Sequence, residues 1–322
     1  MRAMIEVKDL RKIYPARSRG TEPVDAVRGV DVTVGEGEIV GFLGPNGAGK
    51  TTTMRMLTTL LAPTAGSGTV AGCDLLADPV GVRRRIGYVA QSGVTQPEAL
   101  VGEELVDHAR MFGIRKEEAR RRGHLLLGQL DLDGLWSGKC STLSGGQRRR
   151  LDIAMGLINE PRLMFLDEPS TGLDPQSRAN LWEHITRLRA TTGTTVFITT
   201  HYMDEADALC DRVIVIDDGA VAASGTTDEL KRSVSGDTVV LTLDDDSDVR
   251  LIGSILGSEV EDLVAEQTVV RFQVAHDGPG LPKILRALAE HDIEPIGAEI
   301  RRPTLDDVFL SLTGRSLRDE AA

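Results

Sequence analysis

Short, unbroken apolar runs recur from the N-terminus to about Leu230, and longer segments with helical periodicity separate them. The clearest runs are Ile39–Leu43, Leu163–Leu166, Thr195–Thr199 and Arg212–Ile216. Apolar runs of this length without alternation are typical of strands that are buried on both faces of a sheet. The pattern therefore predicts an α/β domain whose strands are covered by helices.

One stretch departs from this alternation of strands and helices. Between Glu98 and Trp136 the apolar residues keep a helical period, the outward positions are rich in Arg and Glu, and no run has the character of a strand. We interpret it as part of a helical subdomain, over about residues 98–160, inserted into the α/β domain.

Small and polar residues at Ser233–Asp237 predict a linker, which gives a first domain over residues 1–232 and a second over 237–322. A final helix is expected over Thr304–Leu312, because Thr304 and Asp307 can cap its start. Between the linker and this helix the pattern predicts a strand, a helix, two strands, a helix and a strand: Thr238–Leu243, Val249–Leu256, Glu259–Ala265, Thr268–Val274, Leu281–His291 and Pro295–Ile300. This βαββαβ order suits a small α+β sandwich of the ferredoxin-like type.

Composition and charge fit two globular domains. The chain has 322 residues, of which 41% are hydrophobic and 27% charged, so it can bury a core. Its formal net charge of -12 argues against a general nucleic-acid binder, which needs a concentrated positive face. The three cysteines, Cys73, Cys140 and Cys210, are widely spaced and predict neither a disulfide framework nor a zinc site, as expected in a reducing compartment.

No apolar stretch approaches the roughly 18 to 20 residues that a membrane-spanning helix needs. Charged residues also interrupt Met1–Leu10, where a signal peptide would need an apolar core. We therefore expect a protein that stays in the cytoplasm and does not span a membrane.

A glycine-rich loop follows the predicted strand Ile39–Leu43 and precedes a helical stretch from Thr52. It matches the phosphate-binding loop at every defined position: Gly44, Pro45, Asn46, Gly47, Ala48, Gly49, Lys50 and Thr51. In such a loop the glycines let backbone N–H groups surround a phosphate, the Lys reaches the β- and γ-phosphates, and the Thr hydroxyl is placed for Mg²⁺. The loop predicts a site for ATP and Mg²⁺.

Two carboxylates follow the apolar run Leu163–Leu166 directly. Asp167 and Glu168 would thus lie at the C-terminal edge of a parallel sheet, where nucleotides bind in doubly wound folds. We expect Asp167 to bind Mg²⁺ and Glu168 to act as the general base toward the water that attacks the γ-phosphate.

Between these two elements stands Leu143-Ser144-Gly145-Gly146-Gln147, followed by a predicted helix from Arg148 to about Asn159. Here the sequence resembles the ATP-binding subunits of ABC transporters, whose hallmark is an LSGGQ loop between the two nucleotide motifs. The resemblance implies an ABC-type ATPase fold, with the helical insertion, plus the small C-terminal α+β domain as an accessory domain. It also adds Thr52, Ser144, Gly145, Gly146 and Gln147 to the residues that contact nucleotide.

The resemblance extends to smaller elements, matched position by position. Tyr14 stands where the family has the aromatic residue that stacks on adenine. Gln91, after the predicted strand Ile86–Ala90, resembles the glutamine that senses Mg²⁺ and links the site to the membrane partner. Asp174 ends a Ser-Thr-Gly-Leu-Asp stretch that resembles the loop at the dimer seam, and His201 resembles the switch histidine at the γ-phosphate.

In this family each ATP is held between the phosphate loop of one subunit and the LSGGQ loop of another. Because each loop occurs once here, the resemblance implies a homodimer or a paired ATPase subunit, with Ser144 and Gly146 contacting the γ-phosphate across the interface. It also implies a peripheral position on the cytoplasmic side of the cell membrane, bound to an integral membrane permease subunit. The C-terminal strands Val239–Leu243 and Val269–Val274 could present an apolar face for dimerisation.

Short segments next to the motifs resemble those of the daunorubicin-resistance type of drug exporters. They are Arg148–Asp152 after the LSGGQ loop, Pro175–Arg178, and Pro303–Phe309 near the end. The arginines at the helix start face an unfavourable helix dipole and call for an acidic partner, for which a second subunit is one source.

Two other functions are compatible with the same nucleotide chemistry. Soluble ABC ATPases act on ribosomes or DNA, but such proteins usually fuse two ATPase domains or carry a long coiled coil, which this chain lacks. An ATPase subunit of an importer would have the same motifs. The C-terminal domain and the exporter-like segments next to the motifs favour export of a drug-like or other small molecule.

Overall fold

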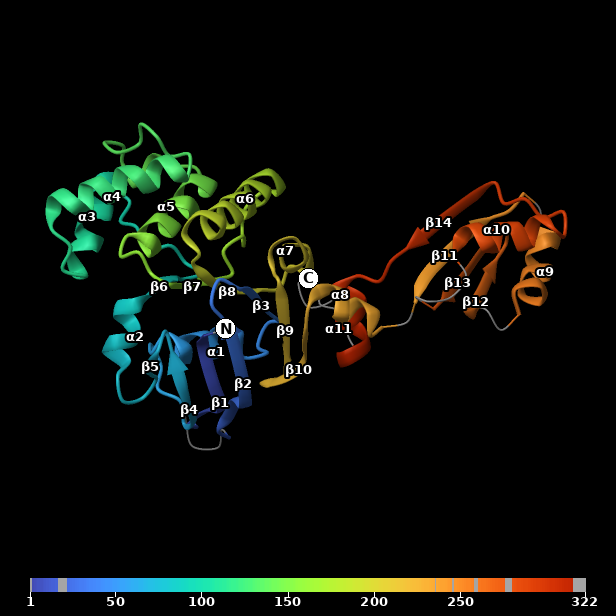
Figure 1. Ribbon diagram of the computed structural model, residues 1–322, viewed down its shortest axis with the longest axis horizontal. Helices are drawn as coiled ribbons and strands as arrows, with labels where there is room; N and C mark the ends of the chain where they lie inside the picture. The colour runs from blue at the N-terminus through green and yellow to red at the C-terminus, as the bar shows by residue number, and fades with distance from the viewer. Residues whose placement is uncertain are drawn as a thin grey trace. The chain divides into compact units, whose positions relative to one another are not determined.

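The structure is a computed structural model that describes residues 2–16, 22–234, 236–244, 246–257, 260–275 and 280–314. Its contacts divide the chain into two compact units, with the boundary between Thr227 and Asp228 (Figure 1). We call them the first and the second unit.

A six-stranded sheet carries the first unit. The strands lie in the order β10-β9-β3-β8-β7-β6; all are parallel except β10, which pairs antiparallel with β9. Their bounds are β3 Ile39–Leu43, β6 Ile86–Val89, β7 Leu163–Asp167, β8 Thr195–Thr200, β9 Arg212–Asp217 and β10 Ala220–Gly225. Every residue of β3, β7 and β8 is buried, which confirms the α/β fold expected from the continuous apolar runs.

An antiparallel sheet, in the order β2-β1-β4-β5, packs against the parallel one. Its strands are β1 Ala3–Tyr14, β2 Val24–Gly35, β4 Ala65–Val70 and β5 Cys73–Asp74. One hydrophobic core contains residues of both sheets, such as Ile5 and Phe42, together with Met54 from helix α1 (Lys50–Leu57). This shared core holds the start of α1 firmly beside the end of β3.

The predicted helical insertion is present. It contains α3 (Val101–Met111), α4 (Lys116–Gln129), the short 3₁₀ helix Cys140–Thr142 and α5 (Gly145–Leu157). The remaining helices of the first unit are α2 Pro79–Arg85, α6 Pro175–Thr192 and α7 Met203–Leu209. In Figure 1 the insertion forms the green layer of helices above β6 and β7.

The second unit is a four-stranded antiparallel sheet, with α9 and α10 packed on one face. The strand order β12-β13-β11-β14 confirms the predicted ferredoxin-like arrangement. Its elements are β11 Asp237–Thr242, α9 Asp246–Leu256, β12 Glu261–Glu266, β13 Val269–Val274, α10 Leu281–Ala289 and β14 Gly297–Arg301, flanked by α8 Thr227–Arg232 and α11 Leu305–Thr313. The expected strand start at Glu259 lies outside the described residues. Thr304 and Asp307 cap α11 reciprocally, as predicted.

The apolar face of β11 and β13 is closed within the second unit. Val239 and Phe272 are 2% and 1% exposed, and they pack in one core with Ile252 of α9 and Ile284 of α10. The prediction that this face is presented for dimerisation is therefore wrong, because two helices of the same unit cover it.

The three cysteines are free thiols and all are buried. Among the described residues, the structure contains no helix whose length and apolar character would let it cross a membrane.

Candidate functional site

The phosphate loop joins β3 to α1 and depends on glycine at two close approaches. A Cβ at Gly44 would lie 2.2 Å from the carbonyl oxygen of Ile216, and one at Gly49 would lie 2.7 Å from that of Ala26. Gly49 also has a φ of +102° and forms the N-cap of α1. Helix α1 therefore begins at Lys50, and the start of a helix directs backbone N–H groups toward a bound anion.

Lys50 lies inside this loop with 4% of its surface exposed. Its Nζ donates hydrogen bonds to the carbonyl oxygens of Gly44 at 2.7 Å and Pro45 at 3.0 Å. The same nitrogen lies 3.5 Å from Oε1 of Glu168. The side chain thus places a buried positive charge between the phosphate loop and the end of β7.

Asp167 is the last residue of β7 and is 2% exposed. Its Oδ1 accepts a hydrogen bond of 2.6 Å from the Thr199 hydroxyl and lies 3.5 Å from the Thr51 hydroxyl. Strand β7 therefore brings Asp167 to the start of α1, as the two sequence motifs predicted.

Glu168 is the centre of the cluster. Its Oε2 accepts a 2.8 Å hydrogen bond from Nε2 of Gln91 and lies 3.4 Å from Nδ1 of His201, which follows β8. The hydroxyl of Thr171 donates to the same oxygen at 3.3 Å. Glu168 has a φ of +43°, a conformation that is costly for a residue with a Cβ and that is concentrated at functional sites.

The environments of the two carboxyls shift their pKa values in opposite directions. Burial raises the pKa of Asp167, and the adjacent Glu168 carboxylate adds to this rise. The contact with His201 lowers the pKa of Glu168, with a further contribution from the Lys50 charge, while burial opposes both. Glu168 is thus held as an anion that can accept a proton.

The donor set near Asp167 fits Mg²⁺. The Thr51 hydroxyl and the Asp167 carboxylate lie 3.5 Å apart and are hard oxygen ligands of the kind that Mg²⁺ prefers, whereas the Gln91 amide nitrogen contacts Glu168. Within the described chain no three or more His, Cys, Asp or Glu side chains gather into a metal site. A cation here would complete its shell with substrate phosphates and water, as Mg²⁺ usually does.

The LSGGQ loop and the loop that ends at Asp174 lie against each other. Ser144 caps α5, accepting from the Gln147 N–H at 3.2 Å and donating its own N–H to the Gln147 side chain at 2.9 Å. Asp174 caps α6 by accepting from the Ser177 N–H at 2.9 Å. A Cβ at Gly146 would lie 3.0 Å from the Ser177 hydroxyl, so glycine is what lets the two helix starts approach.

Tyr14, the predicted adenine contact, has a lysine beside its ring in this structure. It ends β1, pairs with Val24 of β2, and has Nζ of Lys12 5.6 Å from its ring centroid. Across the described chain the structure records no contact between Tyr14 and the Glu168 cluster. The adenine-stacking role of this ring stays a prediction.

Arg149 is a residue of the site that sequence reasoning missed. It is 7% exposed, and its guanidinium donates to three backbone carbonyls: Ala90 at 2.6 Å, Pro169 at 2.8 Å and Asp167 at 3.0 Å. The expected acidic partner is not its main contact, since Asp152 lies 3.9 Å away in the same helix. Arg149 instead ties α5 to the ends of β6 and β7. The available signal was its spacing, because Arg149, Ile153 and Gly156 lie on one side of α5 and all three are buried.

We expect Arg149→Met to lower the free energy of unfolding of the first unit by about 3 kcal/mol, because it leaves buried carbonyls without their charged donor. Urea titration of tryptophan fluorescence measures this unit, since Trp136 and Trp182 are the only tryptophans and both lie in it. Arg120→Met, at an exposed position of α4, is the matched control. Equal shifts for the two variants would contradict a bracing role for Arg149.

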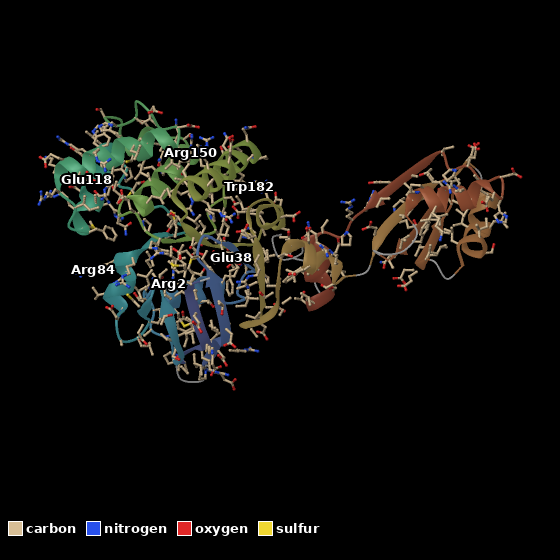
Figure 2. All side chains as sticks on the ribbon, viewed as in Figure 1. Arg2, Glu38, Arg84, Glu118, Arg150 and Trp182 are labelled. Carbon is tan, nitrogen blue, oxygen red and sulfur yellow. The ribbon has the colours of Figure 1, made fainter. Side chains whose placement is uncertain are left out.

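A buried carboxyl connects α7, the helix that follows His201, to α6. Glu205 of α7 is 0% exposed, and its Oε1 accepts a 3.0 Å hydrogen bond from Nε1 of Trp182. Trp182 stands on α6 (Figure 2). Burial raises the pKa of Glu205, which favours its neutral form. This bond fixes α7 to α6, the helix that Asp174 caps.

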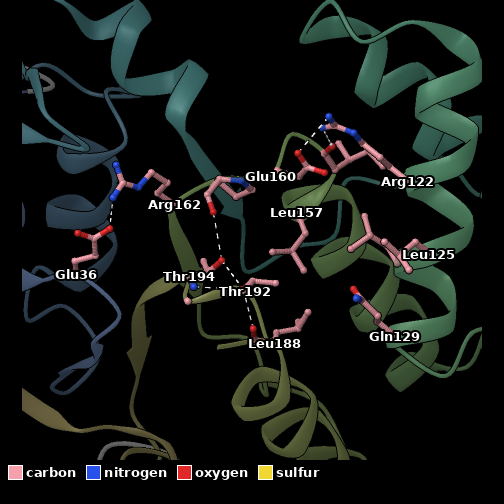
Figure 3. Close-up of a pocket in the computed structure, with 14 residues that line it drawn as sticks. Glu36, Arg122, Leu125, Gln129, Leu157, Glu160, Arg162, Leu188, Thr192 and Thr194 are labelled. Carbon is pink, nitrogen blue, oxygen red and sulfur yellow. Dashed lines mark hydrogen bonds and ion pairs between the residues drawn. The ribbon is translucent and has the colours of Figure 1, made fainter. Parts of the chain in front are cut away.

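An apolar cavity of about 450 Å³ opens elsewhere in the first unit (Figure 3). Leu125, Leu157 and Leu188 contribute to its lining, as do Arg162 and Thr194, which directly precede β7 and β8. Asp167 ends β7 and His201 directly follows β8, so both lie at the other ends of these two strands. The cavity is therefore at the opposite edge of the sheet and is not part of the nucleotide site.

A phosphate loop, two carboxylates at the end of a buried parallel strand, and an LSGGQ loop that caps a helix of the insertion together define an ATP-binding cassette. Comparison with known families agrees. The ABC transporter family matches residues 27–171, and the family of the C-terminal domain of DrrA1-3-like ATP-binding proteins matches residues 225–313.

Several relatives match over nearly the full chain. The daunorubicin resistance ATP-binding protein DrrA3 of Streptomyces coeruleorubidus is 40% identical over 297 residues, 92% of this chain and 94% of the relative. The doxorubicin resistance ATP-binding protein DrrA of Mycobacterium tuberculosis is 41% identical over 316 residues, 96% of this chain and 93% of the relative. Among solved structures, a dimeric ATP-binding cassette in a post-hydrolysis state with ADP and Pi is 28% identical and covers 69% of this chain and 98% of its own, with a TM-score of 0.62.

The chain belongs to the ABC transporter ATP-binding proteins of the DrrA daunorubicin/doxorubicin resistance type.

Proposed function

We propose that this chain hydrolyses ATP to power the export of a drug-like or other small molecule through a separate membrane permease subunit. The observation that carries the proposal is the cluster around Glu168, which joins Lys50, Gln91 and His201 to one carboxylate. The names of the relatives, which are resistance proteins for daunorubicin and doxorubicin, support the direction of transport.

In this proposal each residue of the cluster has its own task. Backbone N–H groups of residues 46–52 and the Lys50 ammonium bind the β- and γ-phosphates. Glu168 accepts the proton of the attacking water, and His201 and Gln91 hold its carboxylate in place. Thr51, Asp167 and Gln91 would hold Mg²⁺, which when bound neutralises charge on the phosphates.

We further propose a head-to-tail dimer in which two ATP molecules lie between subunits. Ser144, Gly145, Gly146 and Gln147 would contact the nucleotide bound by the partner, with Asp174 at the seam. Support comes from the exposure of Ser144 and Gly145 at the start of α5 and from the dimeric state of a related cassette. The positive end of α5 suits a γ-phosphate at this position.

The proposed cassette covers residues 1–232, and an accessory domain covers 237–322. The chain would lie on the cytoplasmic face of the cell membrane, bound to the permease. Closure of the dimer would be transmitted to the permease through the segment after Gln91, whose side chain contacts Glu168.

The test is co-purification of tagged Glu168→Gln from its native membrane with ATP and Mg²⁺, because blocked hydrolysis holds the closed complex together. Lys50→Ala, which we expect to bind ATP poorly, is the matched control. Recovery of a multi-span membrane protein of exporter type only with Glu168→Gln would support the proposal. Recovery of ribosomes or DNA-repair proteins would overturn the transport assignment, and a permease accompanied by a substrate-binding protein would overturn export.

A further inference from the structure

Strand β14 leaves one edge of the second unit's sheet open. It pairs with β11 on one side, and within the described chain no strand pairs with its other side. The strand at the opposite end of the sheet, β12, protects its edge with Glu261, Asp262 and Glu266 and with an irregular register. An open strand edge is a template for a further strand, so the two ends of this sheet are not equivalent.

The side chains of β14 alternate between the two faces of the sheet. Ile300 is opposite Val239 and therefore lies on the face that α9 and α10 cover, yet it is 41% exposed because it stands at the edge. Glu299 and Arg301 are opposite Val240 and Thr238 and lie on the other face. They form an ion pair of 3.1 Å along the strand. The edge therefore offers an exposed apolar residue on one face and a pair of opposite charges on the other.

We infer that a second copy of this chain adds its β14 antiparallel to the open edge, with a two-fold axis at Ile300, and so joins the two sheets into one. In this register Glu299 is opposite the partner's Arg301, and Arg301 is opposite the partner's Glu299. Ile300 is opposite the partner's Ile300 on the other face. The contact is closed and symmetric, as expected of a homodimer interface.

The charges of Glu299 and Arg301 favour this register over registers with the two-fold axis at the residue before or after Ile300. An axis at Glu299 would place Glu299 opposite the partner's Glu299, and an axis at Arg301 would place two arginines opposite each other. Like charges directly opposite in adjacent strands are destabilising, whereas opposite charges stabilise the pair. Only the axis at Ile300, among these three, gives two unlike pairs and one apolar pair.

This contact goes beyond the proposed ATP sandwich. It uses the second unit alone, contains none of the nucleotide-binding residues, and predicts self-association without nucleotide. The proposed function does not depend on it, because the Glu168 cluster lies in the first unit.

The experiment is sedimentation velocity of the full chain over a concentration series, with EDTA and without nucleotide. We expect a reversible dimer. In Glu299→Arg, each facing pair at these two positions consists of two arginines. In Arg301→Glu, each facing pair consists of two carboxylates. Each variant alone should therefore have a dimer dissociation constant at least tenfold higher than the wild type. An equimolar mixture of the two variants should recover the dimer, because every facing pair is again unlike. The double variant Glu299→Arg/Arg301→Glu should recover it as well.

Four results would overturn the inference: a wild-type chain that stays monomeric, single variants that dimerise like the wild type, and a mixture or a double variant that stays as weak as the single variants. Recovery in the mixture also shows that both variants are folded. ATP turnover serves as the control readout, since neither residue belongs to the catalytic cluster and both variants should retain the wild-type rate.

Discussion

Glu168→Gln is expected to bind ATP with nearly wild-type affinity and to hydrolyse it about 10²- to 10⁴-fold more slowly, the contribution typical of a general base. The amide keeps the shape of the side chain and can still accept from Nε2 of Gln91 at the position now 2.8 Å away. It cannot take a proton from water. Single-turnover hydrolysis and equilibrium binding of a fluorescent ATP analogue separate the two effects.

The matched control is Glu117→Gln, which removes a carboxylate at an exposed position of α4. It should leave both binding and turnover unchanged. If Glu168→Gln kept the wild-type rate, another group would have to accept the proton. If it lost affinity for ATP as well, the side chain would be needed to hold the phosphate loop.

Lys50→Ala is expected to fail one step earlier, at nucleotide binding. The variant removes a buried ammonium that is pre-positioned inside the phosphate loop, and loss of one member of a buried charge pair typically costs about 2–5 kcal/mol. This corresponds to roughly a 30- to 4,000-fold weaker Kd for ATP. Isothermal titration with ATP and Mg²⁺ measures it directly.

Lys8→Ala, at an exposed position of β1, removes an equal charge from the surface and should leave the Kd unchanged. A thermal melt of both variants tests folding, because Lys50 also faces Glu168 at 3.5 Å. A folded Lys50→Ala protein with the wild-type Kd would show that the backbone of the loop alone binds the phosphates.

Patterns within short sequence segments were enough to predict many of the strands, the phosphate loop and the cap of the last helix. The continuous apolar runs that became β3, β7, β8 and β9 were visible because a strand buried on both faces needs an apolar side chain at almost every position. The glycines of the phosphate loop and the cap at Thr304 were visible because backbone conformation and capping depend on neighbouring residues. The element order of the second unit followed from the same local patterns.

The antiparallel sheet of the first unit was not predicted. Its strands β1 and β2 carry several register irregularities, and β4 has exposed or half-buried residues over most of its length, so no clean alternation reveals them. The pairing of β1 with β4 joins residues far apart in the chain, and the antiparallel sheet shares one core with the parallel sheet.

The tertiary structure alone decided which polar side chains are buried and what satisfies them. Arg149 suggested an exposed helix start with an acidic partner, but its partners are carbonyls 59, 20 and 18 residues away in the chain. The same holds for Glu205 and Trp182, 23 residues apart, and for Gln91 and Glu168, 77 residues apart. The sequence by itself determined the chemistry and the elements that carry it, because these depend on local periodicity and motif. Which of these groups meet, and which face of the C-terminal strands is closed, is set by packing between segments that no local pattern records.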